Sequence, residues 1–158
     1  MCEVCFCITV KKAVMQLRLT FLLLLFAGTI NAQIRKIPAD VTDAFAARYP
    51  HAQRVSWKDE LANFEAEFTL NGFEMSAEFN GRGEWQNSGK KIKFEDLPSE
   101  VQDGFAKSKY GDWQKISITE IEKNSQPIQY RIYVKKSAFG KYLYFDANGK
   151  LLREALKI

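Results

Sequence analysis

Residues 37–45 (IPADVTDAF) and residues 97–105 (LPSEVQDGF) are near-copies of one stretch, set sixty positions apart. In each copy a proline suits the first helical position, where its missing N–H is harmless. The acidic residue two places later suits the positive end of the helix dipole. Each copy therefore predicts the start of a helix, and the recurrence indicates one structural unit built twice.

The likeness between the two copies continues beyond the predicted helices. Residues 49–56 (YPHAQRVS) match residues 110–117 (YGDWQKIS), and residues 79–85 (FNGRGEW) match residues 145–151 (FDANGKL). Two copies with a period of about sixty residues indicate a duplication rather than a solenoid, whose repeats are shorter and more numerous. We expect the first repeat to span 36–94 and the second to span 95–158.

Within each repeat, the residues after the helix alternate between apolar and polar, as strands with one buried face do. Residues 64–70 place Phe64, Ala66 and Phe68 on one face, Asn71-Gly72 suits a two-residue hairpin turn, and residues 73–79 return with Phe73, Met75, Ala77 and Phe79 inward. Residues 87–96 (NSGKKIKFED) look like a polar linker. The pattern predicts an α+β fold of tandem duplicated units, each a helix plus a four-stranded antiparallel meander.

The N-terminal part of the chain has the features of an export signal. Within residues 15–32, Arg18 precedes the apolar run 21–26 (FLLLLF), and a cleavage site follows near Ala32. The apolar run is too short to span a bilayer, so no stable membrane insertion is expected after cleavage. We expect a periplasmic or secreted protein whose residues 33–158 form a single two-lobed domain.

Residues 1–14 contain all three cysteines of the chain, Cys2, Cys5 and Cys7. Three thiolates without a fourth ligand make a poor zinc site. We interpret this segment as a misassigned upstream start, with translation beginning at Met15. A peptide from residues 1–14 in the natural precursor would contradict this interpretation.

The expected mature chain, residues 33–158, excludes several classes of function. Removing Lys11, Lys12, Arg18 and Glu3 from the totals leaves 20 basic and 18 acidic residues, so the net charge is small. Nucleic acid is therefore not an expected partner. A chain of 126 residues can bury a core without disulfides or metal, and we expect no cofactor.

Together, the Leu/Ile-Pro-x-acidic-Val helix starts, the tyrosine near each helix end and the aromatic-(Asn/Asp)-x-x-Gly turns resemble the PepSY-like proteins. This family of small exported bacterial proteins is described as β-lactamase-inhibitor-like. The resemblance implies helices packed on one face of a curved antiparallel sheet. It also implies that the open face of the sheet grips another protein, as the β-lactamase inhibitor grips its enzyme. No inhibitory motif transfers residue by residue, so the resemblance bears on fold more than on activity.

The outward positions of the predicted sheet are the candidate site, and the two repeats differ there. The first repeat is acidic and the second is basic and aromatic, with tyrosine and arginine serving as typical interface anchors. The acidic set is Glu65, Glu67, Glu74, Glu78 and Glu84, and the basic and aromatic set is Arg131, Tyr133, Lys135, Tyr142, Tyr144 and Lys150. The pattern favours a non-catalytic module that binds an exported or envelope protein, or a peptide.

Other interpretations of the same residues stay open. Outward positions of a one-sided sheet are polar in any case, and cross-strand tyrosines also stabilise sheets. The opposite charges could instead pair the two lobes or two molecules. A second functional hypothesis is a sensor or carrier that holds a small ligand between the helices and the sheet.

Catalysis and metal binding find little support in the sequence. His51 is the single histidine, follows Pro50, and suits a turn better than a general base. No Gly-x-Ser-x-Gly elbow occurs. Glu65 and Glu67 lie on one strand face, which suits neither a glycosidase pair nor a calcium loop. We predict no catalytic residue and no metal site.

Overall fold

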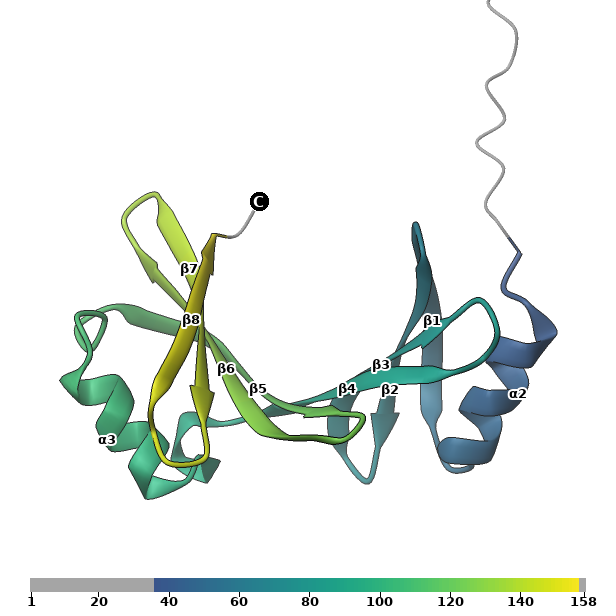
Figure 1. The fold of residues 1–158 in the computed structure, drawn as a ribbon, viewed down its shortest axis with the longest axis horizontal. Coiled ribbons are helices and arrows are strands. Elements are labelled where there is room, and N and C mark those ends of the chain that lie inside the picture. The colour runs from purple at the N-terminus through teal and green to yellow at the C-terminus, as the bar shows by residue number, and fades with distance from the viewer. Residues whose placement is uncertain (1–35, 157–158) are drawn as a thin grey trace, which may run out of the picture. The chain divides into compact units, whose positions relative to one another are not determined.

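The computed structural model describes residues 36–156, which form an eight-stranded antiparallel sheet and two α-helices (Figure 1). Strand order in the sheet equals chain order, so every strand pairs with the strand before it. The α+β prediction is confirmed at this level. The elements are α2 (Ala39–Arg48), β1 (Gln53–Glu60), β2 (Asn63–Leu70), β3 (Phe73–Asn80), β4 (Trp85–Ile92), the 3-10 helix η1 (Phe94–Asp96), α3 (Ser99–Lys107), β5 (Gln114–Lys123), β6 (Gln126–Lys136), β7 (Phe139–Asp146) and β8 (Leu151–Leu156).

Four predictions fall on residues outside 36–156. The upstream start at residues 1–14, the cysteine cluster, the signal at residues 15–32 and the cleavage site near Ala32 all lie outside the described residues. They stay predictions.

Both helices begin as the repeated stretch predicts, but one residue later. Pro38 and Pro98 occupy the N-cap instead of the first helical position. The carbonyl of Pro38 accepts hydrogen bonds from the N–H groups of Val41 and Thr42, at 3.1 and 3.2 Å. A proline at the N-cap supplies a carbonyl to the first turn and loses nothing by lacking an N–H, so the sequence signal is the same for both positions.

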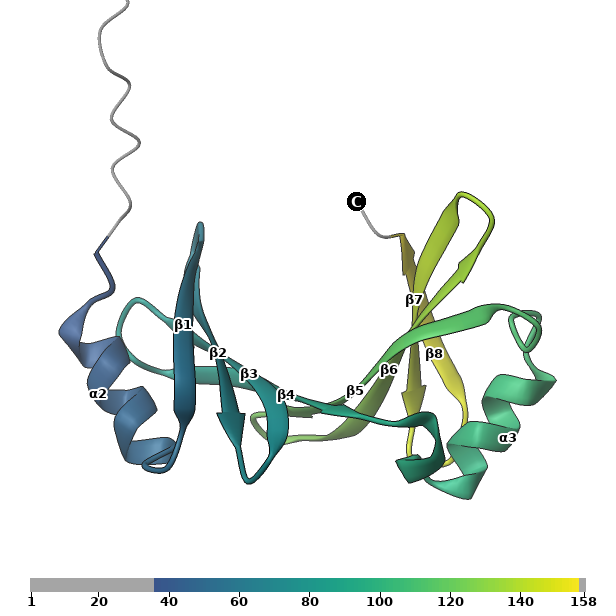
Figure 2. The same cartoon turned by 180° about the vertical axis from the view of Figure 1, so that it is seen from behind.

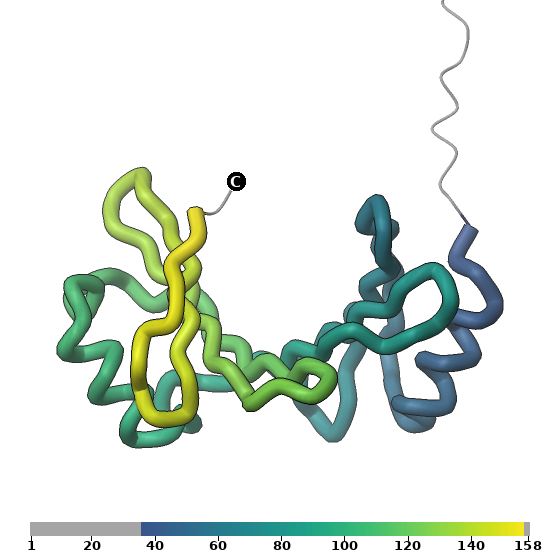
Figure 3. Tube along the Cα trace, viewed as in Figure 1, coloured from purple at the N-terminus to yellow at the C-terminus, as the bar shows by residue number. Residues whose placement is uncertain are grey.

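The two helices lie on the same side of the sheet, which curves away from them (Figures 1 to 3). Each helix buries one valine and one phenylalanine against the strands of its own half. The first core joins Val41 and Phe45 to Phe64, Ala66, Phe68, Ala77 and Phe79, and the second joins Val101 and Phe105 to Ile118, Tyr130, Ile132, Val134, Leu143 and Phe145. The alternation predicted for these strands is confirmed, and it leaves the other face of the sheet free of helices.

One residue predicted to be inward is half-exposed. Phe73 pairs with Leu70 beside the Asn71–Gly72 turn and is 42% exposed. The turn itself is as predicted, since Asn71 and Gly72 have φ of 52° and 83°. Phe73 is absent from the buried cluster that α2 joins, and the Lys90 ammonium lies over its ring, 4.0 Å from the centre.

The prediction that residues 87–96 form a linker is wrong for its first six residues. They belong to β4, which pairs with β3 on one side and β5 on the other. The polar stretch fits a central strand because its buried groups find partners. The hydroxyl of Ser88 shares a hydrogen bond with the Tyr49 hydroxyl (2.7 Å) and accepts another from Trp85 Nε1 (2.9 Å). β4 therefore makes the sheet continuous between the two halves.

Candidate binding face

The predicted basic and aromatic residues of β6 and β7 lie on the helix-free face. Arg131 and Tyr133 alternate along β6 with the buried residues Ile132 and Val134 of the second core. Across to β7, Arg131 stands opposite Tyr144, and Tyr133 stands opposite Tyr142. Successive side chains of a strand point to opposite faces, so these four residues share the face that no helix covers.

Three of the predicted residues form one contact group, which we call the aromatic patch: Arg131, Tyr133 and Tyr142. The rings of Tyr133 and Tyr142 lie 4.9 Å apart at 37°. The guanidinium carbon of Arg131 lies 5.3 Å from the centre of the Tyr142 ring. Both tyrosines are half-buried, so each keeps part of its ring exposed. The patch offers two amphipathic rings and one cation side by side.

The remaining basic and aromatic candidates do not join the patch. Tyr144 is only 9% exposed, because the guanidinium of Arg153 on β8 stacks on its ring at 3.4 Å. Lys135 is exposed farther along β6, opposite Gly140. The structure therefore narrows the predicted aromatic surface to one tyrosine pair with its arginine.

The acidic candidates on the first half are compensated by neighbours. Glu67 pairs with Lys58 at 2.5 Å and Glu74 with Lys91 at 2.6 Å, and the hydrogen bond from Lys91 holds the pKa of Glu74 below its ordinary value. Glu78 accepts hydrogen bonds from Asn63 and Asn87, both at 2.6 Å. Desolvation raises the pKa of Glu65. Ion pairs therefore balance two of these four carboxylates, and amide hydrogen bonds hold a third.

Sequence reasoning missed the two lysines that form these ion pairs, Lys58 and Lys91. Lys58 lies on β1, where its cross-strand partner is Glu65, one diagonal step from Glu67. Lys91 lies on β4, in the stretch interpreted as a linker. Only the assignment of this stretch to a strand places Lys91 beside the acidic residues of β3.

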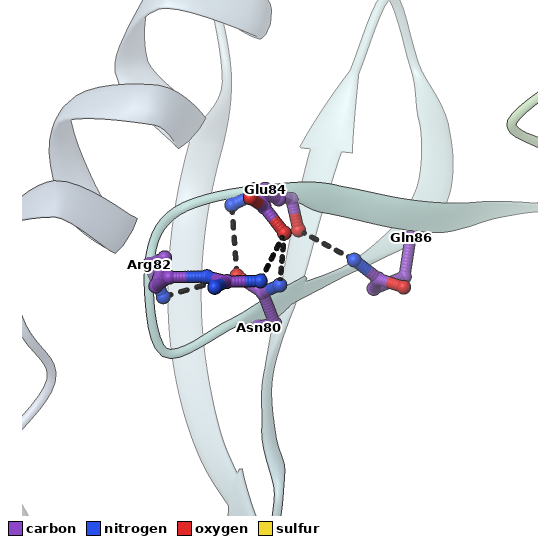
Figure 4. Close-up of polar contacts among 4 residues, drawn as sticks. All are labelled: Asn80, Arg82, Glu84 and Gln86. Carbon is purple, nitrogen blue, oxygen red and sulfur yellow. Dashed lines mark hydrogen bonds and ion pairs between the residues drawn. The ribbon is translucent and has the colours of Figure 1, made fainter.

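Glu84 belongs to a turn and not to the binding face. Its carboxylate accepts a hydrogen bond from Asn80 Nδ2 at 2.5 Å and lies 3.2 Å from the Arg82 guanidinium (Figure 4). Its backbone carbonyl accepts one from Gln86 Nε2 at 3.0 Å. These contacts fix the turn between β3 and β4, which accounts for the acidic residue without a binding role.

A hollow of about 460 Å³ lies beside the aromatic patch and shares Arg131 with it. Its lining runs across the sheet from β1 to β6 and includes Arg54, Ser76, Gly89, Lys91 and Thr119. Arg131 Nη2 lies 3.4 Å from Thr119 Oγ1. Of its lining residues, Glu67, Glu74 and Arg131 were predicted as binding candidates. The others were not, since a hollow formed by several strands has no signature in any one segment.

The described residues 36–156 contain no assembled metal site. No group of three His, Cys, Asp or Glu side chains there is arranged to hold a metal ion. His51 is exposed in the turn that follows α2. No helix among these residues has the length and apolar character to cross a membrane.

Comparisons with known proteins find solved structures of similar fold. Three solved structures from Bacteroides resemble the chain: a protein of B. eggerthii described as "putative periplasmic proteins" (24% identity, TM-score 0.73, 77% of this chain and 89% of that one), a DUF2874 family protein of B. ovatus (25%, 0.72, 77% and 88%) and a BLIP-like protein of B. fragilis (23%, 0.68, 77% and 86%). No curated protein sequence matches the chain. The family model described as "Putative beta-lactamase-inhibitor-like, PepSY-like" matches residues 62–153, more than half of the sequence. The chain therefore belongs to the PepSY-like, β-lactamase-inhibitor-like family.

Proposed function

We propose that this protein is an exported, non-catalytic module that grips a protein or peptide with the helix-free face of its sheet. Membership of an inhibitor-like family supports a binding role. The structural neighbour from B. eggerthii is described as periplasmic, which supports export. The partner we expect is an exported or envelope protein, because such a module meets its target outside the cytoplasm.

The observation that carries this proposal is the aromatic patch. Tyr133 and Tyr142 are held against each other, so their rings lose little freedom when a partner covers them. Arg131 beside them adds a fixed cation with several hydrogen-bond donors. Tyrosine and arginine dominate the energetics of protein interfaces when they sit at the centre of the contact.

We also propose that the two halves descend from one duplicated unit. Each half contains a helix followed by four strands, and each begins with a Pro-x-acidic-Val helix start. In both halves the tyrosine after the helix bonds to the fourth residue of the last strand, Ser88 in β4 and Glu154 in β8. This repeated contact supports duplication beyond the repeated sequence.

A carrier that holds a small ligand between helix and sheet is less well supported. In the first half that space contains Phe45, whose ring lies 5.0 to 6.2 Å from those of Trp57, Phe68 and Phe79. In the second half Phe105 packs against Phe94 and Phe145. A ligand there would have to displace packed rings, whereas the helix-free face needs no rearrangement.

The test is affinity capture from an envelope extract of the producing organism. The parent is compared with a Tyr133→Ala, Tyr142→Ala variant whose fold is checked by circular dichroism. We expect the parent to retain a protein that the variant captures at least tenfold less. Loss of two central aromatic anchors weakens the binding free energy by about 2 kcal/mol or more.

Leu61→Asn is the matched control, since Leu61 is 97% exposed in the turn between β1 and β2 and Asn tolerates its positive φ. The control should retain the partner as the parent does. Equal capture by parent and double variant would reduce the tyrosines to sheet stabilisers. A small molecule that raises the melting temperature of both equally would favour the carrier.

A further inference from the structure

The sheet has two edge strands, β1 and β8, because within residues 36–156 each of them pairs with one neighbour only. An edge strand exposes N–H and C=O groups on its outer side, and a further strand can pair with them. The main chain of β8 is open in this way. Glu154 is exposed as a residue although its side chain is only 28% exposed, so the exposed part is largely main chain.

The first half shows what occupies the equivalent edge there. β4 corresponds to β8, since each is the last strand of its half and bonds to the tyrosine after the helix. The outer side of β4 pairs with β5, antiparallel, over residues 87–92. β4 has a bulge at Gln86 just before this segment, and β8 has one at Leu152. The bulge therefore does not prevent pairing, and residues 153–156 of β8 correspond to the start of the paired segment of β4.

The other edge of the sheet is protected against strand addition. The register of β1 shifts between Gln53 and Ser56, where Arg54 has φ of 54°. The last three residues of β1, 58–60, are all charged. Bulges and charged side chains are the devices by which edge strands avoid further pairing. β1 is therefore a poor acceptor of a strand, and β1 of a second copy is a poor strand to add to β8.

The edge of β8 carries more positive than negative charge. Arg153 lies on the helix-free face, where its guanidinium stacks on a ring of β7. No carboxylate within residues 36–156 forms an ion pair with it. On the other face, Glu154 is held by Lys109 and Lys141 at 2.9 and 3.0 Å. An added strand is therefore favoured by an acidic residue opposite Arg153, whereas an acidic residue opposite Glu154 would meet a like charge.

β5 has the same preference for basic neighbours in the first half. Glu120 stands opposite Lys90 of β4, and Glu122 lies 3.5 Å from Arg48, which precedes the tyrosine after α2. In β8 the residue that corresponds to Lys90 is Leu156, which is 70% exposed. An apolar residue opposite Leu156 would cover it, since directly opposed side chains in an antiparallel pair are in contact.

We propose that an extended segment of the partner pairs with residues 153–156 of β8 as a ninth, antiparallel strand. The segment carries an acidic residue opposite Arg153 and an apolar residue opposite Leu156, three positions earlier in its own sequence. In strand addition the main-chain hydrogen bonds give affinity and the side chains give specificity. This inference rests on the proposed function and specifies the partner. Ala155 of β8 stands opposite Tyr142, so one partner can contact both the edge and the aromatic patch.

The test is a titration of the purified protein at low salt with capped peptides, followed by NMR of the backbone amides. The probe Ac-Thr-Val-Thr-Thr-Glu-Thr-NH₂ has its valine three positions before its glutamate, and a second peptide has glutamine in place of the glutamate. We expect the glutamate peptide to bind at least threefold more tightly. It should also slow hydrogen exchange at alternate amides of residues 153–156 at least tenfold, because alternate N–H groups of a strand point outward. Unchanged exchange in these residues at saturating peptide would overturn the proposal.

Two N-methylated forms of the glutamate peptide test the main-chain contact directly. One is methylated at its second and fourth residues, and the other at its third and fifth. Because alternate N–H groups face the neighbouring strand, only one form loses the donors that face β8. We expect that form to bind at least tenfold more weakly than the other. Equal binding of the two forms would exclude strand addition.

Two variants of β8 test the side chains. We expect Arg153→Gln to abolish the advantage of the glutamate peptide, with the glutamine peptide as the control for folding. Lys150→Gln removes an exposed charge just before β8 and should retain the advantage. Leu156→Asn should keep the melting temperature and weaken both peptides at least threefold. If Arg153→Gln keeps the advantage, or Leu156→Asn binds as the parent does, the assigned segment is wrong.

Light scattering of the protein alone distinguishes a partner from a second copy. We expect a monomer at the concentrations of the titration. An oligomer that Leu156→Asn disperses would replace the partner by a second copy as the occupant of the edge, and so overturn the proposal. Failure of the peptide titration would leave the capture experiment unaffected, because that experiment depends on Tyr133 and Tyr142. The two proposals can therefore fail separately.

Discussion

The two halves of the molecule make the same long-range contact with different chemistry. Tyr49, after α2, shares a hydrogen bond with Ser88 of β4, and Tyr110, after α3, donates one to Glu154 of β8. Ser88 is 3% exposed, while the side chain of Glu154 is 28% exposed. β4 lies inside the sheet and β8 lies at its edge. A buried strand must satisfy the tyrosine with a neutral group, whereas an edge strand can use a charge that water partly solvates.

The edge position also lets the second half build a cluster around its carboxylate. Lys109 and Lys141 lie 2.9 and 3.0 Å from Glu154, and Lys141 also donates to the Tyr110 hydroxyl. Among the described residues, the first half has no such cluster at Ser88, whose second partner is the Trp85 ring nitrogen. The comparison indicates that position in the sheet, more than position in the repeat, decides which polar chemistry holds the helix end.

The largest expected effect concerns a feature that the halves share, the glycine of each aromatic-(Asn/Asp)-x-x-Gly turn. A Cβ at Gly149 would lie 1.9 Å from the Glu100 carbonyl oxygen, and a Cβ at Gly83 would lie 2.4 Å from that of Asp40. Both glycines have positive φ. We expect Gly149→Ala to lower the free energy of unfolding by about 3 kcal/mol or more, and Gly83→Ala by slightly less, in chemical denaturation.

Alanine substitutions at two other glycines separate the stability lost through a positive φ from the stability lost through steric overlap. Gly72 has φ of 83° with nothing within 4 Å of its Cβ position, so Gly72→Ala should cost only about 1 kcal/mol. Gly81 has open space and no positive φ, so Gly81→Ala should change stability by less than about 0.5 kcal/mol. If Gly149→Ala costs no more than Gly72→Ala, the close contact between turn and helix is not rigid.

These turns also show how far the sequence alone could go. The repeated Pro-x-acidic-Val and Asn/Asp-x-x-Gly motifs are local, so they predict the turns correctly and the helix starts to within one residue. The alternation of residues 64–70 likewise predicts their buried face. Ser88 and Gly89 have low intrinsic preference for strands, and only their contacts with distant residues make β4 a strand.

The candidate site was harder to predict than the fold, for the same reason. Tyr133 and Tyr142 could be assigned to one face from alternation, but the stacking of Arg153 on Tyr144 depends on the register of β7 and β8. The hollow depends on the register of six strands and on the bulge at Arg54. Local periodicity carries none of this information.

An effect of intermediate size should distinguish the Tyr110–Glu154 contact from the Tyr49–Ser88 contact. Only the stabilisation from the first should depend on pH. The hydrogen bond from Tyr110, followed by those from Lys109 and Lys141, lowers the pKa of Glu154 from 4.5 to about 2. A lowered folded-state pKa stabilises the protein above about pH 4.5, and this stabilisation is lost as the pH falls toward 2. We expect Glu154→Gln to lower the free energy of unfolding by about 1 to 2 kcal/mol at pH 7 and by almost nothing near pH 2.

Ser88→Ala is the control for this pH dependence. It removes a buried hydroxyl shared by Tyr49 and Trp85, with a similar expected cost of about 1 to 2 kcal/mol. Its cost should be the same at pH 7 and pH 3, since no group that titrates in this range takes part in the contact. If Glu154→Gln lowers the free energy of unfolding equally from pH 7 to pH 2, then Glu154 does not contact Tyr110, Lys109 and Lys141 in solution.

The smallest effect concerns the basic residue that precedes each tyrosine. Arg48 stacks on Trp85 at 3.8 Å and lies 3.5 Å from Glu122, whereas Lys109 contacts Glu154 from an exposed position. We expect Arg48→Gln to cost about 0.5 to 1 kcal/mol, chiefly through the lost stacking. Because contact with a ring depends less on salt than an exposed ion pair does, most of this cost should persist in 1 M NaCl.

Lys109→Gln should lower the melting temperature less than Arg48→Gln does, and its effect should vanish in the same salt. Equal salt sensitivity of the two variants would mean that Arg48 acts through Glu122 and not through Trp85, and that both halves hold the helix end by ion pairing.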